Sequence, residues 1–331
     1  MSCGGHKKVD VSNIDINVKI ERFDKDFDSM QYKPMAQQAA FLKKKYGYFY
    51  QDFIEQILSA GKIGDTSYFQ TLREMFKGQA YHDLKHDVDS VYPNLDEQNA
   101  ELTDAFRRIK YYFPKQKTLN VYAYFSGFEV QRSIGNDYCA IGLDLFLGGN
   151  SRFYPALTKA YPHYLSRFFN PQNIAPRVVE GILREDMFPE HDDDKPLLDR
   201  MVYNGKIMYL MDQVLPDVAD STKIGYTTRQ YDWAQQFEGS IWGYFMEQNL
   251  LYEADYNKIQ AYVSVAPFTP GLGEHNESAP KLGIWTGWQI VKKYMDKHPE
   301  ITPLQLMEET DNQKILNGAK YHPVDVKGGG K

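Results

Sequence analysis

Cysteine is scarce in this chain, which has two among its 331 residues, Cys3 and Cys139. A single pair gives no disulfide framework of the kind that stabilises small secreted domains. Cys139 lies in an apolar, strand-like stretch, and we expect it to be a small buried side chain. Cys3 therefore needs a separate explanation.

Long hydrophobic runs and an excess of positive charge are also missing. No run of about 18 or more apolar residues occurs, so no segment is expected to span a membrane. The formal net charge is −6, and the one lysine cluster, Lys43–Lys45, suits the C-terminal end of a helix. We expect no nucleic-acid partner, because such binding normally needs a basic stripe or patch.

Motifs of common enzyme classes are absent from the sequence as well. It has no nucleophile elbow, phosphate-binding loop or dinucleotide fingerprint. His82 and His86 are one helical turn apart, as in zinc hydrolases, but Asp83 stands where those enzymes have glutamate. A solvated helix face explains this pair better, and a metallohydrolase with an atypical site remains the alternative hypothesis.

Aromatic residues, in contrast, are abundant, with 25 Tyr, 19 Phe and 4 Trp. Trp233 and Trp242 flank one aromatic-rich helical stretch, and Gly283–Val291 is another. Core packing is the simplest interpretation. A glycan- or peptide-binding module is a second alternative, because aromatic faces supply large contact areas at low entropy cost.

The hydrophobic pattern predicts an α+β fold, mostly helical with a small antiparallel sheet. Expected strands are 16–23, 119–125 and 138–147, the last two paired antiparallel across a Gly-containing loop. Expected helices are 49–58, a helix capped by Asp65 and carrying Phe69, Leu72 and Phe76, another over 95–113, and then 154–168, 173–187, 196–215, 228–252, 283–297 and 303–309. We expect a single domain over 14–325, between a tether over 1–13 and a flexible tail over 326–331.

Cys3 occupies the place that the first residue of a mature bacterial lipoprotein would have. A small residue, Ser2, precedes it, and the flexible polar stretch Gly4–Lys8 follows it. A cysteine of this kind receives lipid after a signal peptide has been removed. We therefore expect a lipid on Cys3 and no other cofactor, with the protein held to the membrane by acyl chains rather than by a spanning helix.

Taken in order, several segments resemble the gliding-motility-associated lipoprotein family GldB: Asp10–Ile14 after Cys3, Val18–Phe23, Ile141–Gly148, Gly283–Tyr294 and Ile315–Pro323. The resemblance covers nearly the whole chain. It implies an envelope lipoprotein of Bacteroidota, needed in gliding bacteria for motility, which depends on the type IX secretion apparatus.

The same resemblance implies a distant similarity to zinc peptidases of the HExxH type, and hence a degenerate zincin-like, metallopeptidase-like scaffold. The corresponding helix here, Pro176–Asp186, contains no histidine, so it cannot bind zinc in the usual way. We expect no metal site and no catalytic residue. The former cleft is expected to survive as a binding site lined by Glu180, Arg184, Glu185 and Trp285.

These observations predict a non-catalytic envelope lipoprotein, a pseudo-peptidase, that works through protein–protein interaction in envelope assembly, protein secretion or gliding motility. Its expected partners are envelope proteins, such as a secretion, motility or outer-membrane assembly complex. The residues after Cys3 are not acidic. We therefore expect the periplasmic face of the outer membrane rather than the cell surface.

Overall fold

The computed structural model describes residues 8–190, 195–273 and 277–326, so Cys3 lies outside the described residues. The contacts divide the chain into two compact units. The N-terminal unit comprises Val11–Lys110 and Lys115–Asp186. The C-terminal unit comprises Tyr111–Pro114 and the described residues of Met1–Asp10 and Met187–Lys331. The expected single domain over 14–325 stays a prediction.

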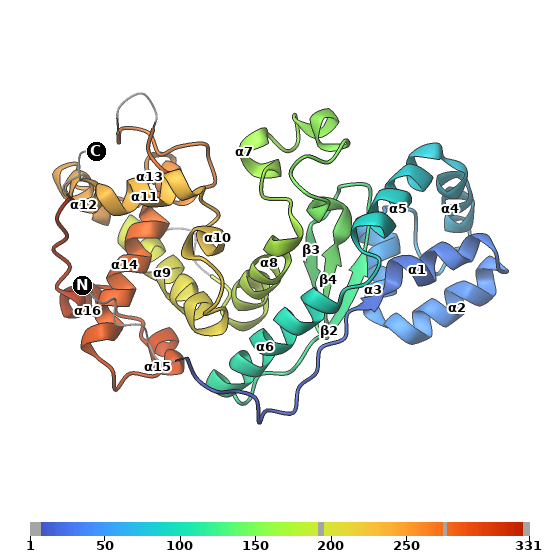
Figure 1. Ribbon diagram of the computed structural model, residues 1–331, viewed down its shortest axis with the longest axis horizontal. Helices are drawn as coiled ribbons and strands as arrows, with labels where there is room; N and C mark the ends of the chain where they lie inside the picture. Colours follow the sequence, from blue (N-terminus) through green and yellow to red (C-terminus); the bar gives the residue numbers. More distant parts are fainter. Residues whose placement is uncertain (1–7, 191–194, 274–276, 327–331) are drawn as a thin grey trace. The chain divides into compact units, whose positions relative to one another are not determined.

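The N-terminal unit contains a small four-stranded sheet in the order β1-β2-β4-β3 (Figure 1). Its strands are β1 (Glu21–Arg22), β2 (Asn120–Tyr124), β3 (Arg132–Ile134) and β4 (Tyr138–Gly142). β2 runs parallel to both β1 and β4, and β3 runs antiparallel to β4. The expected antiparallel pairing of the two main strands was therefore wrong, and the sheet is mixed.

The cause of this error is β3, which the sequence pattern did not reveal. The loop over 125–131 leads into β3, and the turn at Gly135–Asp137 joins β3 to β4 as a hairpin. β4 thus returns to the direction of β2 and pairs with it, with Asn120 opposite Tyr138 and Tyr124 opposite Gly142. All five residues of β4, an interior strand of the sheet, are buried.

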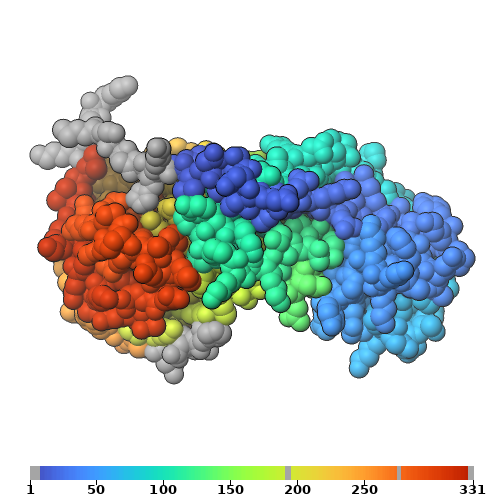
Figure 2. Space-filling view, turned by 90° about the horizontal axis from the view of Figure 1, so that it is seen from below, coloured from blue at the N-terminus to red at the C-terminus, as the bar shows by residue number. Residues whose placement is uncertain are grey.

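The expected strand over 16–23 is also shorter than predicted, because strand pairing is confined to Glu21–Arg22. Residues 11–20 form an extended strip along α6 (Asp96–Tyr112), as Figures 1 and 2 show. Backbone N–H groups of Val18 and Ile20 donate to the side chains of Thr103 and Asn99. Helix side chains therefore take the place of a neighbouring strand.

The helices of the N-terminal unit are α1 (Phe23–Asp28), α2 (Met35–Tyr46), α3 (Tyr48–Asp52), α4 (Tyr68–Lys77), α5 (Gln79–Val91), α6, α7 (His163–Ser166) and α8 (Ile174–Gly181). α3 and α8 continue as π-helical turns over Phe53–Ile57 and Ile182–Met187. The N-cap residue of α4 is Ser67, and the expectation that Asp65 caps this helix was wrong. The Asp65 carboxylate instead accepts a hydrogen bond from the backbone N–H of Ser67.

The expected helix over 154–168 is broken into a 3₁₀ turn (Tyr154–Leu157) and α7. Pro162 explains the break, because a proline disfavours the helical conformation of the residue before it. At the centre of this unit, the fully buried ring of Phe23 packs within 5.6 Å, centroid to centroid, of four aromatic rings: Phe27, Tyr46, Phe49 and Phe53.

The C-terminal unit is helical: α9 (Leu197–Val214), α10 (Asp220–Ile224), α11 (Thr228–Gln236), α12 (Glu238–Glu247), α13 (Tyr256–Val263), α14 (Leu282–Lys297), α15 (Pro303–Glu308) and α16 (Asn312–Ala319). α9 and α14 pack at very close range. A Cβ atom added at Gly287 would lie 1.8 Å from the Met201 carbonyl oxygen, and one added at Gly205 would lie 2.3 Å from the Gly287 carbonyl oxygen.

The expected helix over 228–252 is divided at Phe237, whose backbone leaves the helical region. Asp325 supports the second helix, α12, because its carboxylate accepts hydrogen bonds from the Ser240 N–H and from the Ser240 hydroxyl. A residue distant in the sequence thus accepts a hydrogen bond from a backbone N–H group in the first turn of α12. A local sequence pattern cannot show such a contact.

Candidate functional site

The predicted cleft residues on α8 are held in ion pairs. Glu180 contacts Arg177 at 2.6 Å through one carboxylate oxygen and Arg184 at 3.0 Å through the other. Glu185 lies 2.6 Å from the guanidinium of Arg132 on β3. The structure therefore places Glu180, Arg184 and Glu185 in short ion pairs around one helix.

Gly181 makes room for Arg132 beside α8. A Cβ atom at Gly181 would lie 2.2 Å from the Arg132 Nε atom. The guanidinium therefore needs a glycine in order to cross α8 and reach Glu185. This arrangement ties α8 to the edge strand of the sheet.

Trp285, the fourth predicted cleft residue, belongs to α14 in the C-terminal unit and is 1% exposed. Trp288 is also buried, and its indole N–H donates to Asp212 at 2.8 Å. Both rings pack inside the unit and have no free face for a ligand.

His82 and His86 both lie on the exposed side of α5, where their imidazoles face solvent. Among the described residues, no group of three or more His, Cys, Asp or Glu side chains is arranged to hold a metal ion. The residues that the structure describes also contain no helix that combines the length and the apolarity needed to cross a membrane.

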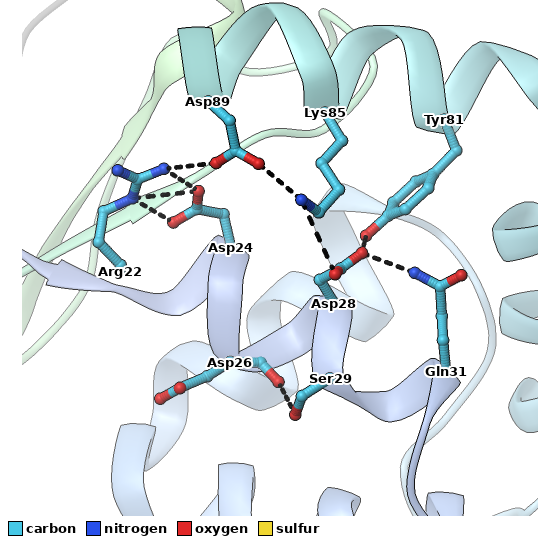
Figure 3. Close-up of polar contacts among 9 residues, drawn as sticks. All are labelled: Arg22, Asp24, Asp26, Asp28, Ser29, Gln31, Tyr81, Lys85 and Asp89. Atoms are coloured by element: carbon cyan, nitrogen blue, oxygen red, sulfur yellow. Dashed lines mark hydrogen bonds and ion pairs between the residues drawn. The ribbon is translucent and has the colours of Figure 1, made fainter. Parts of the chain in front are cut away.

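A charged cluster between α1 and α5 was missed at the level of sequence (Figure 3). Arg22 contacts Asp24 at 2.6 Å and Asp89 at 3.4 Å, and Lys85 links Asp89 at 2.6 Å to Asp28 at 3.9 Å. The Tyr81 hydroxyl donates to Asp28 at 3.0 Å. We call these six residues the α1–α5 cluster.

Burial controls the electrostatics of this cluster. Asp24 is 4% exposed, and burial raises the pKa of its carboxyl group although hydrogen bonds from Arg22 oppose the rise. Burial alone would lower the pKa of Lys85, but its hydrogen bond to Asp89 and the charges of Asp28 and Asp89 raise it instead. Three carboxylates facing two cations give the ionised cluster a formal charge of −1.

The sequence does contain a signal for the α1–α5 cluster. Asp24 and Asp28 are four residues apart, and so are Lys85 and Asp89, so each pair projects from one face of its helix. Both pairs lie beside apolar positions, which is unusual for charged residues unless they pair with each other. Periodicity alone could not show that the two faces meet.

An apolar cavity of about 440 Å³ adjoins the cluster in the same unit. We call it the aromatic pocket. Its wall includes Phe27 and Tyr81, two residues that also border or belong to the cluster. The other lining residues are Phe53, Leu58, Glu74, Met75, Gly78, Ala80, Leu84, Phe125, Ser126, Gly127, Phe128 and Phe153.

A buried carboxylate fixes one wall of the aromatic pocket. Asp144 is 0% exposed and accepts hydrogen bonds from the backbone N–H groups of Ser126 at 3.0 Å and Phe128 at 2.7 Å. Burial raises the pKa of Asp144 to about 6, although these hydrogen bonds oppose the rise. The loop that carries Ser126 and Phe128 is therefore held by a carboxyl group whose burial costs free energy.

The same loop stores backbone strain. Phe128 has a φ of 72°, a left-handed conformation that a bulky residue rarely adopts. Its carbonyl oxygen accepts a hydrogen bond from the Tyr161 hydroxyl, so the strained residue is held on both sides. Such strain persists only where surrounding contacts enforce it, and it is often found at ligand-binding walls.

Together these features describe a preformed site for an apolar group. Hydrogen bonds inside the protein engage the Tyr81 hydroxyl, which donates to Asp28, and one oxygen of the Asp144 carboxylate, which accepts from the backbone N–H groups of Ser126 and Phe128. A cavity of this volume and lining accepts one or two apolar side chains or a small apolar ligand.

Two of the segments noted in the sequence contribute to these features: Arg22 of the cluster lies in Val18–Phe23, and Asp144, which holds Ser126 and Phe128 of the pocket wall, lies in Ile141–Gly148. A model of the family described as gliding motility protein GldB matches residues 4–323. The chain belongs to the GldB family. Membership of this lipoprotein family implies involvement in gliding motility and a membrane anchor.

Neither a curated protein nor a solved structure matches this GldB-family chain. The mostly helical α+β fold expected from the sequence is confirmed, apart from the direction of strand pairing. The expected similarity to zinc peptidases is not shown by the comparisons and stays a prediction.

Proposed function

We propose that this GldB-family protein acts without catalysis, as an envelope lipoprotein that binds a protein partner in gliding motility and the associated secretion machinery. The aromatic pocket supports this proposal most directly. It is preformed and apolar, and its wall is fixed by Asp144 and Phe128. An apolar side chain of a partner is the group that such a pocket accommodates best.

The environment of α8 is consistent with a structural role for that helix. Both oxygens of Glu180 are engaged by arginines, and Glu185 is paired with Arg132. Carboxylates used in this way stabilise the packing of the helix. We propose that a lipid on Cys3 keeps the protein at the periplasmic face of the outer membrane.

The proposal is tested by purifying the full-length protein from gently crosslinked envelopes of a gliding strain and identifying what accompanies it by mass spectrometry. The informative variant is Ala80→Phe, which fills the aromatic pocket from an exposed helix position. Ala40→Phe, an equally exposed position on α2 away from the pocket, is the matched control.

We expect a stoichiometric envelope protein with the wild type and with Ala40→Phe, and its loss with Ala80→Phe. Gliding on agar, measured in a strain deleted for its own family member, should fall in parallel. Equal recovery and gliding for both variants would show that the pocket is not the docking site. Stoichiometric zinc in the purified protein, lost in His82→Ala, would instead support the metallohydrolase alternative.

A further inference from the structure

A second cavity, of about 360 Å³, lies in the C-terminal unit and differs from the aromatic pocket in carrying charges. It is bounded by one face of α9, by Phe188–Glu190 and Lys195 before that helix, and by the turn between α15 and α16. We call it the Lys206 pocket. Its lining residues are Phe188, Pro189, Glu190, Lys195, Asp199, Tyr203, Lys206, Met307, Glu309, Thr310 and Asn312.

Lys206 is the unusual group in this pocket. It is 5% exposed, and its ammonium donates a hydrogen bond to the backbone carbonyl of Glu309. Among the described residues, no carboxylate lies within ion-pairing distance of it. An ammonium has three donors, so a buried lysine with one neutral acceptor is incompletely satisfied. Buried charges are normally paired, so a buried ammonium with no carboxylate partner among the residues that the structure describes favours an anionic ligand.

Asp199 supplies the opposite charge on the same face of the helix. The spacing Asp199, Tyr203, Lys206 follows the repeat of an α-helix, and all three side chains line the pocket. No ion pair of Asp199 occurs in the described part of the chain. The Tyr203 hydroxyl donates to the Phe188 carbonyl, which leaves its ring as an apolar surface between the two charges.

The other charges around the pocket argue against a phosphate or another dianion. Asp199, which has no ion pair in the described part of the chain, borders the pocket and would repel a doubly negative group. Glu309 is itself neutralised by Lys314, at 2.5 Å. A ligand with one negative and one positive end would leave the fewest unpaired charges in the pocket.

We propose that this pocket binds a small zwitterion, an amino acid or short peptide whose carboxylate pairs with Lys206 and whose ammonium pairs with Asp199. The two Cα atoms are about 10.5 Å apart along the helix, at about 1.5 Å per residue. The Lys206 side chain is directed toward the helix N-terminus and shortens this distance at the level of the charges. The ligand therefore needs a spacer between its charged ends, as in a dipeptide or an amino acid with a side-chain amine.

The protonation state of Lys206 gives the site a characteristic pH dependence. Burial lowers the pKa of Lys206 to about 8, and the charge of Lys195 acts in the same direction, whereas Glu309 and Asp199 oppose it. The titratable groups facing Lys206 are Asp199 and Tyr203 on α9, Glu190 and Lys195 before it, and Glu309 after α15. Carboxylate binding should weaken as the pH rises through about 8.

The test is isothermal titration calorimetry on the full-length chain with ω-amino acids of increasing length: glycine, 4-aminobutyrate, 6-aminohexanoate and 8-aminooctanoate. Hexanoate and hexylamine serve as probes that each lack one charge. We expect an optimum at intermediate length and binding at least about tenfold tighter than that of hexanoate or hexylamine. Between pH 7 and pH 9 the affinity should fall while the ligand amine, with a pKa of about 10.4, remains protonated.

Lys206→Met keeps the apolar stem and removes the charge, and it should weaken binding at least about tenfold. Asp199→Asn should weaken the ω-amino acids but not hexanoate. Lys297→Met, at an exposed lysine outside the pocket, is the control and should bind as the wild type does. A thermal melt of Lys206→Met that matches the wild type shows that any loss is local.

Two results would overturn the inference. One is wild-type affinity in Lys206→Met. The other is the absence of heat with every probe up to about 10 mM, well above the concentration at which a millimolar site is occupied. The inference is independent of the partner-binding proposal, because its variants lie in the C-terminal unit and its readout needs no partner.

Discussion

The close packing of α9 against α14 predicts a large effect of a single methyl group. In Gly287→Ala the new Cβ atom would lie 1.8 Å from the Met201 carbonyl oxygen, whereas ordinary contacts begin near 3.4 Å. The helices must therefore separate by about 1.6 Å at this point, because a backbone oxygen within a helix cannot rotate away. Overpacking of cores costs about 1–3 kcal/mol. A forced separation of two backbones belongs at the upper end, about 3 kcal/mol.

Equilibrium urea unfolding of the purified chain, followed by tryptophan fluorescence, measures this free energy. All 4 tryptophans belong to the C-terminal unit, so the signal reports the unit that contains α9 and α14. The control is Gly243→Ala within α12, where an added Cβ has nothing within 4 Å. There alanine should stabilise the unit by up to about 1 kcal/mol, because glycine is the poorer helix former.

The two substitutions are thus expected to have opposite signs. A Gly287→Ala variant within about 0.5 kcal/mol of the wild type, a range usual for harmless surface changes, would refute the packing argument. Combining Gly287→Ala with Gly205→Ala extends the test. Both glycines serve the same approach of two helices, so the double variant should lose less than the sum of the single losses.

Three further predictions follow from other features. Phe23→Ala should destabilise the N-terminal unit by about 3–5 kcal/mol in urea unfolding, because a fully buried ring is removed from an aromatic cluster; a loss below about 1 kcal/mol would contradict it. Since the pKa of Asp144 is raised from 3.8 to about 6, the native state binds more protons than the unfolded state between these values. Its contribution to stability therefore falls by up to about 3 kcal/mol as the pH rises from about 4 to about 6 and stays low above that. The difference in unfolding free energy between the wild type and Asp144→Asn should show this fall. A difference that stays constant over this pH range would mean that the pKa of Asp144 is not raised. Cys3→Ala should release the protein from the membrane fraction in a cell-fractionation assay, and a variant that remains membrane-bound and supports gliding would disprove lipid anchoring through Cys3.

Local patterns were sufficient for most helices and insufficient for the sheet. The helix predicted over 196–215 is α9, and the one over 283–297 is α14, because long amphipathic or buried segments are marked by their own periodicity. The direction of β4 depends on β3, a strand of three half-buried residues with no clear alternation. Its pairing is decided by tertiary contacts, which a sequence window does not contain.

The candidate sites show the same division. Glu180, Arg184 and Glu185 were placed correctly on one helix, but the arginine that engages Glu185 comes from β3. The α1–α5 cluster joins residues some 60 positions apart, and the aromatic pocket depends on the left-handed backbone of Phe128. Neither a distant pairing nor a strained φ angle leaves a periodic trace in the sequence.

The position of β1 in the sheet has a consequence for the order in which the chain folds during synthesis. Glu21 pairs with Tyr122 and Arg22 with Ala123, so the first strand to leave the ribosome must wait for about a hundred further residues before its neighbour exists. Contacts of such long sequence separation slow folding, because a large loop must close before they form. During that interval Glu21 and Arg22 are without the strand with which they pair. If the protein is exported, as proposed above, this delay is an advantage, since translocation requires a polypeptide that has not yet folded.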